Sequence, residues 1–405
     1  VEEADHLRRS LTSFRRLGTI GAFEDKFING MLNNGYDLTV AKRFFSQIEG
    51  FADYGFPESH AAAFAMLAYV SAWLKCHHPA IFACALLNSQ PMGFYAPAQI
   101  VRDVRDHSVE TRPICVNYSE WNNALERRSD GALALRLGFR QIKGFKEEEA
   151  GWIVAARGNG YPNPETLWLR AGLRPDVLTR LAEADAFCNM GLTRRDALWQ
   201  VKAIRSAKPL PLFNDPIDGE SINEPQIILP SMHLGEEVVE DYVSTRLSLR
   251  AHPMELLRPS IAGLTPHNAL IDVPLGRHTV CGLVITRQRP GTASGVIFLT
   301  LEDETGVSNV VVWPKIYERF RRVVMGGRLL HVQGYLQREG IVVHLIAQDI
   351  CDMSHKLSEL GHPMPEALTT EGPQADDTPK TSRYPARATH PRQQAKRLFP
   401  SRDFH

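Results

Sequence analysis

The part of this sequence that most resembles a catalytic site is a cluster of carboxylates. Two-metal phosphoryl transfer requires several carboxylates close together, and the densest local group is Glu302-Asp303-Glu304. Alternation along a strand would put Glu302 and Glu304 on one face, but the run leads straight into a turn at Gly306. We therefore expect a β-hairpin with a solvated acidic tip, and we expect no catalytic residue and no metal ligand in this chain.

Other reactive residue types lack the spacing that chemistry requires. Cys76, His77 and His78 are adjacent, so on a helix their side chains would diverge. There is no glycine-rich phosphate loop and no Ser/His/Asp arrangement. The 6 cysteines are scattered without a Cys-x-x-Cys pair, which argues against a disulfide framework or a zinc knuckle and fits a reducing cytoplasm.

Two glycine turns between apolar segments are typical of binding to a nucleic-acid backbone. In "LGFRQIKGFKEEEAGWIVAAR" (137–157), a short helix would end at Gly144 and a second helix would contain Ala150. This helix-hairpin-helix pattern points backbone N–H groups at a phosphate, helped by the positive end of the second helix. A weaker copy follows at 178–199. The residues expected to contact DNA are Lys143, Gly144, Lys146, Gly191, Arg194 and Arg195.

An ordinary αα-hairpin is the alternative for either copy alone. Two copies in one chain favour DNA binding that is independent of sequence and sensitive to salt.

A run of β-type segments predicts a barrel later in the chain. The segments are 278–286, 296–301, 307–313, 328–335 and 341–347. Turn signals rich in Gly and Pro separate them. A helical stretch, Pro314–Val324, falls between the third and fourth. Five strands with a helix in that place is the plan of an OB-fold barrel.

OB-fold barrels bind single strands by stacking bases on aromatic side chains and following phosphates with basic ones. Phe298, Trp313 and Tyr335 are the available aromatic residues. Phe298 and Trp313 have the alternative of lying in the core. The cations expected to contact nucleic acid are Arg287, Arg289 and Arg338.

The segment "KPLPLF" (208–213) has the composition of a short docking peptide. An extended peptide ending in two apolar residues can fill an apolar pocket on a partner. The alternative is a linker that folds back onto a neighbouring domain. The residues expected to bind a partner are Leu210, Leu212 and Phe213.

Bulk properties limit the remaining possibilities. The 405 residues suit two to four domains, and 46 basic residues balance 46 acidic ones, so nucleic-acid contact must come from local patches. The apolar run Ala61–Val70 continues to Leu74 but closes at Lys75 and Pro79. It is too short for a membrane span of about 20 residues, and we expect a buried helix and no membrane association. The opening "VEEADHLRRS" suggests a portion of a longer protein.

These elements together resemble the C-terminal part of the bacterial C-family DNA polymerases, the polymerase III alpha subunits. The specific signature is "YGFPESHA" with a following "WLK" (54–75), and the resemblance covers nearly the whole chain. "LNSQPMGFY", "TLEDETG…NVVVWP" and the terminal "SRDFH" are more similar to the error-prone, damage-inducible branch. The fold class expected is multidomain α+β.

The resemblance implies a division of the chain. We expect part of a helical fingers domain at 1–115 and a tandem helix-hairpin-helix domain at 116–205. A linker with a short helix would occupy 206–265, the OB-fold domain 266–352 and a flexible basic tail 353–405. In the family, the palm with its metal-binding aspartates precedes the fingers. The resemblance therefore implies Mg²⁺ in the full-length polymerase with ligands outside this chain, and a chain that alone is inactive.

The resemblance also implies site residues and partners. The fingers hold the incoming nucleotide and the templating base, and a helix start near Pro57 suits triphosphate oxygens. The residues implied to face nucleotide or template are Gly55, Phe56, Ser59, His60 and Lys75. The implied partners are primer–template DNA, a deoxynucleoside triphosphate, and either a sliding clamp or a Y-family-like accessory protein. The function expected is damage-induced translesion synthesis and DNA repair.

A free-standing DNA-binding adaptor without enzymatic activity is the alternative. A palm encoded in frame before residue 1 would favour the polymerase, whereas a nearby start codon would favour the adaptor.

Overall fold

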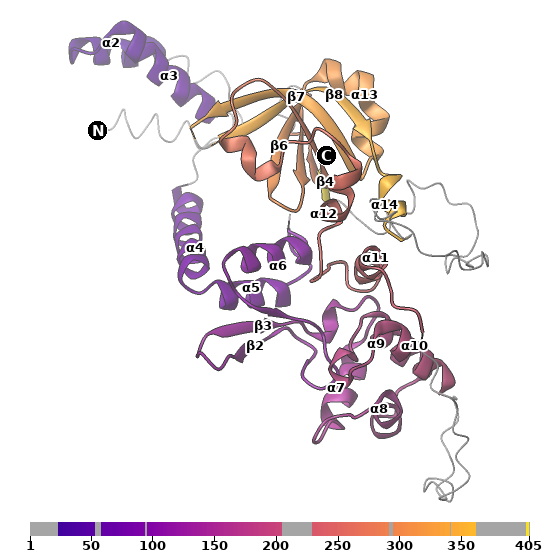
Figure 1. Ribbon diagram of the computed structural model, residues 1–405. Coiled ribbons are helices and arrows are strands. Elements are labelled where there is room, and N and C mark those ends of the chain that lie inside the picture. Colours follow the sequence, from indigo (N-terminus) through magenta and orange to yellow (C-terminus); the bar gives the residue numbers. More distant parts are fainter. Residues whose placement is uncertain are drawn as a thin grey trace, which may run out of the picture. The chain divides into compact units, whose positions relative to one another are not determined.

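The computed structural model describes residues 23–52, 58–93, 95–204, 229–290, 295–340, 342–361 and 402–404 (Figure 1). The chain divides into two compact units, 1–82 and 83–405, and each is described by itself. Several predictions fall outside the described residues. They are those for Gly55, Phe56, Leu210, Leu212 and Phe213 and for most of the basic tail.

The first unit is helical. Its first two described helices pack through Ile28, Ala41 and Phe45, which are buried, and the rings of Phe27 and Phe45 lie 5.8 Å apart. Apolar residues at helical spacing account for this contact. The helices of this unit are α2 (Glu24–Asn33), α3 (Leu38–Ala52) and α4 (Glu58–His77).

Helix α4 is the apolar, alanine-rich rod that the sequence predicts, but its surroundings differ from the prediction. Large apolar side chains along it are exposed, among them Met66 at 70%, Tyr69 at 73% and Trp73 at 46%. The prediction of a buried helix is therefore wrong for this chain. Apolar composition indicates a surface that would be stabilised by burial, but in this chain the apolar surface of α4 is exposed to solvent.

The second unit begins with helices that share one core with the helix-hairpin-helix region. Leu87, Val104, Leu135, Phe139 and Leu178 belong to that core. The helices and short 3₁₀ turns are α5 (Pro79–Asn88), α6 (Pro97–Asp106), η2 (Phe139–Gln141), α7 (Glu147–Ala155), α8 (Pro164–Ala171), α9 (Pro175–Glu183), η3 (Cys188–Met190) and α10 (Arg194–Ala203).

A small three-stranded sheet lies beside these helices. Strands β2 (Ala124–Arg127) and β3 (Leu133–Arg136) form a hairpin, with Gly131 at φ +83° in the turn. Strand β1 (Thr111–Arg112) adds in parallel to β3, giving the order β1-β3-β2.

The predicted OB-fold barrel is confirmed. The sheet order is β5-β6-β8-β7-β4, and pairing of β5 with β4 closes it. Its core includes Val280, Leu299, Val310, Leu336 and Leu345. The elements are β4 (Arg277–Gln288), β5 (Ile297–Glu302), β6 (Val307–Val312), α13 (Pro314–Gly326), β7 (Leu329–Glu339) and β8 (Val342–Asp352).

One further strand joins the barrel. β9 (Arg402–Phe404) pairs in parallel with residues 286–288 of β4. The pairing of β4 with β7 ends at Leu283, so this stretch of β4 has an edge available. Backbone groups at such an edge bind an added strand readily.

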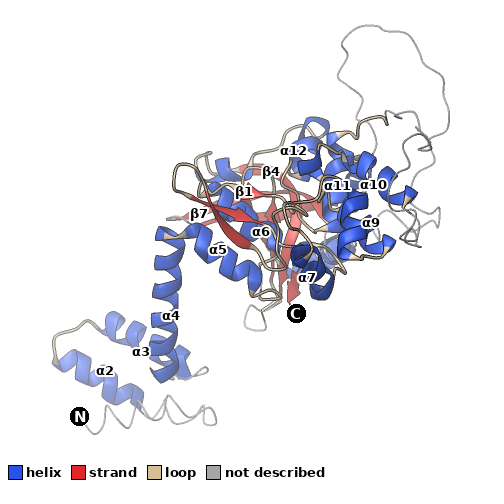
Figure 2. Cartoon of the chain, turned by 90° about the horizontal axis from the view of Figure 1, so that it is seen from below, coloured by secondary structure: helices blue, strands red, loops and turns tan. Residues whose placement is uncertain are grey.

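The segment predicted as a linker contains packed helices from residue 234 onward. Figures 1 and 2 both show α9, α10 and α11 side by side. Met254 and Leu257 are buried against Cys281 of the barrel. This segment therefore connects the helix-hairpin-helix region to the barrel through apolar contacts. Its elements are α11 (Leu234–Ser244), α12 (Pro253–Leu257), η5 (Arg258–Ser260) and η6 (His267–Ile271), and α14 (Lys356–Glu359) packs with them.

Candidate nucleic-acid interface

The first glycine turn has the backbone conformation that the motif requires. Gly144 has φ +72° and open space around its Cα, and Lys143, Gly144 and Lys146 are all exposed. The element before the turn differs from the predicted short helix, because it is only the 3₁₀ turn η2. The core side chains Phe139 and Phe145 stack with ring centroids 5.7 Å apart and fix the turn between them.

The polar groups of this turn are partly used inside the protein. Lys143 N–H donates to the Ser244 carbonyl (2.8 Å), and Lys146 N–H donates to the Glu149 carboxylate (3.1 Å). The Gly144 carbonyl accepts from Arg180 Nη1 (2.9 Å). The two lysines and Arg180 thus surround the turn with positive charge.

Acidic residues in the first turn of α7 oppose that charge. They are Glu147, Glu148 and Glu149, and they already interact favourably with the positive end of the helix. A phosphate at Gly144 would meet cations on one side and carboxylates on the other. We therefore expect binding at this turn to be weak alone and strongly dependent on salt.

The second glycine turn keeps its geometry but uses its cations internally. Gly191 has φ +71° and is exposed. Arg195 Nη2 contacts both carboxylate oxygens of Glu236 (2.7 and 2.8 Å), and Nη1 donates to the Pro230 carbonyl (2.7 Å). Arg195 is thus tied to the segment around α11.

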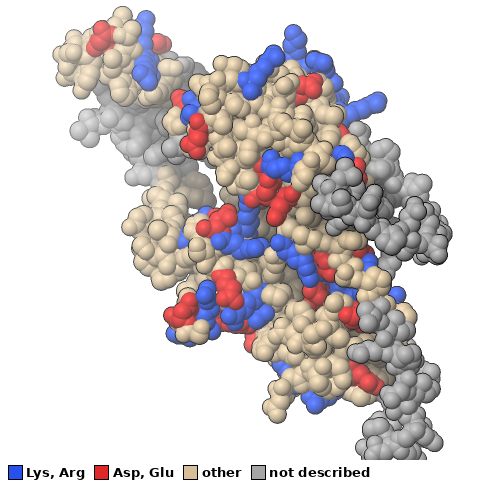
Figure 3. Space-filling view, in the orientation of Figure 1, with Lys and Arg blue, Asp and Glu red and all other residues tan. Residues whose placement is uncertain are grey.

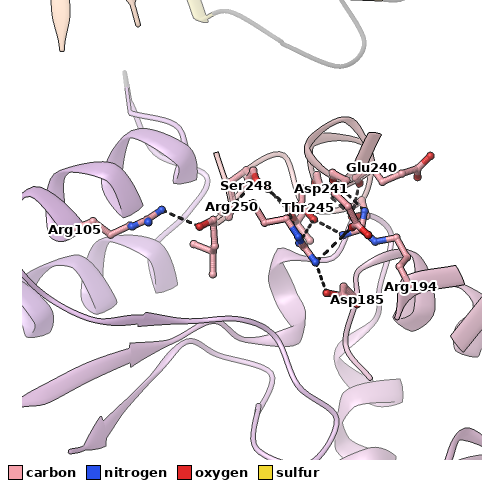
Figure 4. A network of polar contacts seen from close by, with 12 residues as sticks. Arg105, Asp185, Arg194, Glu240, Asp241, Thr245, Ser248 and Arg250 are labelled. Atoms are coloured by element: carbon pink, nitrogen blue, oxygen red, sulfur yellow. Dashed lines mark hydrogen bonds and ion pairs between the residues drawn. The ribbon is translucent and has the colours of Figure 1, made fainter. Parts of the chain in front are cut away.

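Arg194 requires a correction. Its side chain is 1% exposed and pairs with Asp241 and, at 3.4 Å, with Glu237 of α11. Arg250 joins the same network through Asp241 (3.0 Å) and Asp185 (2.6 Å) (Figure 4). A guanidinium enclosed in this way has no path to a DNA phosphate.

The network around Arg194 fastens the second hairpin to α11. Ser248 Oγ donates to Asp241 Oδ2 (2.7 Å), and Arg105 of α6 reaches the Leu249 carbonyl (3.2 Å) (Figure 4). Burial raises the pKa of Glu237, although Arg194 and Arg250 act to lower it. The predicted binding residue is therefore part of a structural ion-pair network.

Two of the three predicted barrel cations are also structural. Arg287 is 2% exposed; its Nε donates to the Val324 carbonyl (2.6 Å) and its Nη2 to the Gly327 carbonyl. It therefore caps the carboxyl end of α13. Arg338 Nη2 donates to the Val273 carbonyl (2.7 Å) and holds the segment after η6. The burial of Arg287 corrects the prediction for that residue, whereas Arg338 is half-buried and its contact with nucleic acid stays a prediction.

The remaining barrel candidates reach solvent. Arg289 is exposed and lies over the Tyr317 ring at 5.4 Å. Trp313 is 52% exposed and Tyr335 47% exposed, so Trp313 does not take the core position that was its alternative. Phe298 is half-buried. Exposed aromatic rings at a barrel surface can stack on unpaired bases.

The acidic hairpin tip is buried, contrary to the prediction of a solvated tip. Glu302 is 4% exposed and Asp303 0%. Glu302 accepts from Arg102 Nη1 (3.0 Å) and Gln99 Nε2 (3.1 Å), both on α6. Asp303 accepts from Arg258 Nη2 (2.6 Å).

Hydrogen-bond donors and charged neighbours favour the charged form of these carboxylates. Burial acts to raise the pKa of Glu302, but His252, Arg102 and Gln99 outweigh it, and the pKa lies below its ordinary value. The same balance lowers the pKa of Asp303, where His267 opposes burial. The hairpin tip thus joins α6, η5 and the barrel.

Across the residues that the structure describes, no three His, Cys, Asp or Glu side chains come together as a metal site. The acidic residues that come closest to forming a metal site, Glu302 and Asp303, are already neutralised by arginines. The described residues therefore do not fit Mg²⁺, and we derive no step through it.

Three of the residues implied to face nucleotide or template, Ser59, His60 and Lys75, lie on α4. Ser59 and His60 are exposed in its first turn, and the His60 and Phe64 rings lie 4.4 Å apart. Lys75 is half-buried in the last turn.

None of the described helices combines the length and the apolar character needed to cross a membrane.

Sequence reasoning missed one basic surface. Helix α13 exposes Lys315, Arg319, Arg321 and Arg322 (Figure 3). The sequence signal for it is four cations within the eight residues 315–322.

Domain families match the two modules just described. A helix-hairpin-helix motif family matches residues 108–197, and an OB-fold nucleic acid binding domain family matches residues 278–351. The fold and these matches define a nucleic-acid-binding protein.

Curated relatives narrow the class. The error-prone DNA polymerase of Ruegeria pomeroyi is 78% identical over 405 residues, which is 100% of this chain and 37% of that protein. Those of Brucella abortus (52% identical, 89% of this chain, 34% of that protein) and Agrobacterium fabrum (46%, 100%, 39%) also match. The chain belongs to the family of error-prone bacterial DNA polymerases and spans little more than a third of the length of these relatives.

Proposed function

We propose that this chain is the C-terminal portion of an error-prone, DNA-directed DNA polymerase and that it holds primer–template DNA during synthesis across damaged template. The observation that carries the proposal is the presence, in one unit, of an exposed glycine turn flanked by Lys143 and Lys146 and a closed OB-fold barrel with exposed Trp313 and Tyr335. The 78% identity with an error-prone polymerase along the whole of this chain supports it.

The two modules would bind different parts of the DNA. The turn at Gly144 would contact a phosphate of the duplex through backbone N–H groups and the neighbouring lysines. The barrel would hold the unpaired template through its aromatic rings. Because both contacts are independent of sequence, they suit a polymerase that must accept any template.

The exposed start of α4 would lie on the nucleotide side. Ser59 and His60 sit where a helix amino terminus attracts triphosphate oxygens, and Lys75 would contact the template from the other end. The exposed apolar side of α4 would pack on another part of the full-length polymerase. This proposal also includes nucleotidyl transfer with Mg²⁺ and repair in the bacterial cytoplasm. It further includes contact of the 208–213 peptide with a sliding clamp or a Y-family-like accessory protein.

Binding to a labelled primer–template hairpin tests the role of the first turn. Lys143→Glu with Lys146→Glu should weaken binding at least tenfold and make the salt slope shallower by about 2, since about 0.9 counterions are released per phosphate contact. Arg127→Glu with Lys202→Glu reverses two exposed charges elsewhere in the same unit and should have a smaller effect. Equal losses in the two double variants would contradict the assignment.

Primer extension tests the polymerase itself. The full-length protein should extend a primer past an abasic site in the presence of Mg²⁺ and nucleotides, and this chain alone should not. Robust extension by the chain alone would show that it contains a catalytic site. Failure of the full-length protein on undamaged template would contradict the proposed activity.

A further inference from the structure

Helix α13 has two chemically different sides. Ile316, Tyr317, Phe320 and Val323 pack against the barrel core. The opposite side is exposed and carries four cations and one acid, namely Lys315, Glu318, Arg319, Arg321 and Arg322. Figure 3 shows Lys and Arg atoms gathered over this helix.

These cations are not neutralised by the protein. Within the described part of the chain, Lys315, Arg321 and Arg322 form no ion pair or side-chain hydrogen bond, and Arg319 contacts only the Phe320 ring, at 4.8 Å. Arg102, Arg194 and Arg258, by contrast, are paired with carboxylates. A concentration of unpaired positive charge attracts polyanions.

Two further groups extend the basic side at its amino-terminal end. Arg289 lies over Tyr317 of α13, which places an additional cation beside the helix. Trp313 immediately precedes the helix and is half exposed. Cations next to an exposed aromatic ring are the combination that binds unpaired nucleic acid, because the ring can stack only on a base that is not in a pair.

The strands of the barrel do not offer an equivalent set. Residues that alternate with the core positions Leu299, Val310, Leu336 and Leu345 point outward, and they include no Lys or Arg. They are Phe298, Thr300, Asn309, Tyr335, Gln337 and His344. Arg277 at the start of β4 is a further exposed cation, but most of the exposed positive charge of this module lies on α13 and Arg289.

We propose that the outer side of α13, together with Arg289 and Trp313, binds the sugar–phosphate backbone of single-stranded nucleic acid. The proposal rests on the proposed function and assigns a specific surface to the unpaired template. Lys315, Arg319 and Arg322 are spaced by four and three residues, and the backbone of α13 departs from helical geometry at Phe320 between the last two.

The test uses this chain and a fluorescein-labelled 20-nucleotide oligo(dT). Lys315→Gln, Arg319→Gln and Arg322→Gln together should lower affinity at least tenfold and make the salt slope shallower by about 2, at about 0.7 counterions per phosphate. The matched control, Arg127→Gln, Arg170→Gln and Lys202→Gln, removes the same charge from exposed positions outside the barrel. It should change affinity less than threefold.

A separate variant isolates stacking. Trp313→Ala should weaken oligo(dT) binding by about fivefold or more and leave binding to a blunt duplex unchanged. Circular dichroism and the thermal midpoint of each variant should match those of the wild type, because every substituted side chain is exposed.

The outcomes separate this proposal from the proposed function. Wild-type affinity for oligo(dT) in the triple variant would overturn the α13 site, and the primer–template assay with the Lys143 and Lys146 variants would still stand. Loss of duplex and oligo(dT) binding in equal measure would also overturn it, since it would show only a change of net charge. Tighter binding of polyglutamate than of oligo(dT) would assign the surface to an acidic protein instead.

Discussion

Arg102 Nη1 lies 3.0 Å from Glu302 Oε1, joining α6, which shares its core with the helix-hairpin-helix region, to a strand of the barrel. The two residues are 200 positions apart in the sequence. Because the Glu302 side chain is only 6% exposed, the pair lies at a buried joint between the two nucleic-acid-binding modules. Their relative placement therefore depends on charges that do not contact DNA.

Removing the arginine from this joint should destabilise it. Arg102→Ala leaves Glu302 buried with one strong donor fewer, and we expect a loss of about 2–4 kcal/mol in the free energy of unfolding. Urea denaturation followed by circular dichroism measures this. Arg105→Ala, one turn along the same helix and exposed, should cost less than about 1 kcal/mol. Equal losses would show that the Glu302 contact adds nothing.

Arg194 should behave as a structural residue. Arg194→Ala leaves Asp241 and Glu237 short of a partner, and we expect a loss of about 3–5 kcal/mol of stability. Any loss of DNA binding should disappear at a temperature where the variant is still folded. Weakened DNA binding in a variant with wild-type stability would restore Arg194 to the DNA interface.

Acid should loosen the barrel joint in two stages. Burial lowers the pKa of His267 below its ordinary value of 6.5, so the unfolded chain takes up its proton first and stability falls as the pH drops through about 6.5. Asp303 and Glu302 have lowered pKa values, so their contribution is present above the ordinary carboxylate range and is lost as pH falls through their folded-state values.

The pH dependence of the unfolding free energy checks this order. His267→Gln should flatten the curve between pH 7 and 5.5 and leave the fall below pH 4.5 in place. An unchanged slope between pH 7 and 5.5 would contradict the role of His267.

The exposed side of α4 should contribute nothing to the stability of this chain. Met66→Gln with Tyr69→Gln removes exposed apolar surface, and we expect the unfolding free energy to change by less than about 0.5 kcal/mol. Binding of a hydrophobic dye should fall. In the full-length protein the same substitutions should reduce activity or stability. A clear destabilisation of the isolated chain would show that α4 packs within it.

Local sequence patterns predicted the elements well where the pattern alone determines the structure. Alternation and turn residues were enough for the five barrel strands, and the left-handed glycines at 144 and 191 were enough for the two turns. The roles of individual charges were not predictable in this way. Arg194, Arg287 and Glu302 look like surface residues in the sequence, and only contacts with distant partners bury them. Strand β9 was missed because three residues carry no periodicity.

The apolar character of a segment was also not enough to predict whether the segment is buried. The run from 61 to 74 predicts a surface that avoids water, but the sequence does not say which segment covers it. In the segment 206–265, expected to be a linker with a short helix, the buried Val239, Met254 and Leu257 that pack the second half are spaced too irregularly to form a clear pattern.

The salt dependence of binding between this chain and a primer–template with a single-stranded overhang tests the central claim most directly. If the hairpin turn and the barrel both hold phosphates, the logarithm of the association constant should fall linearly with the logarithm of salt concentration, with a slope of about −3 or steeper. No binding at low salt, or binding whose affinity does not change with salt, would contradict the account.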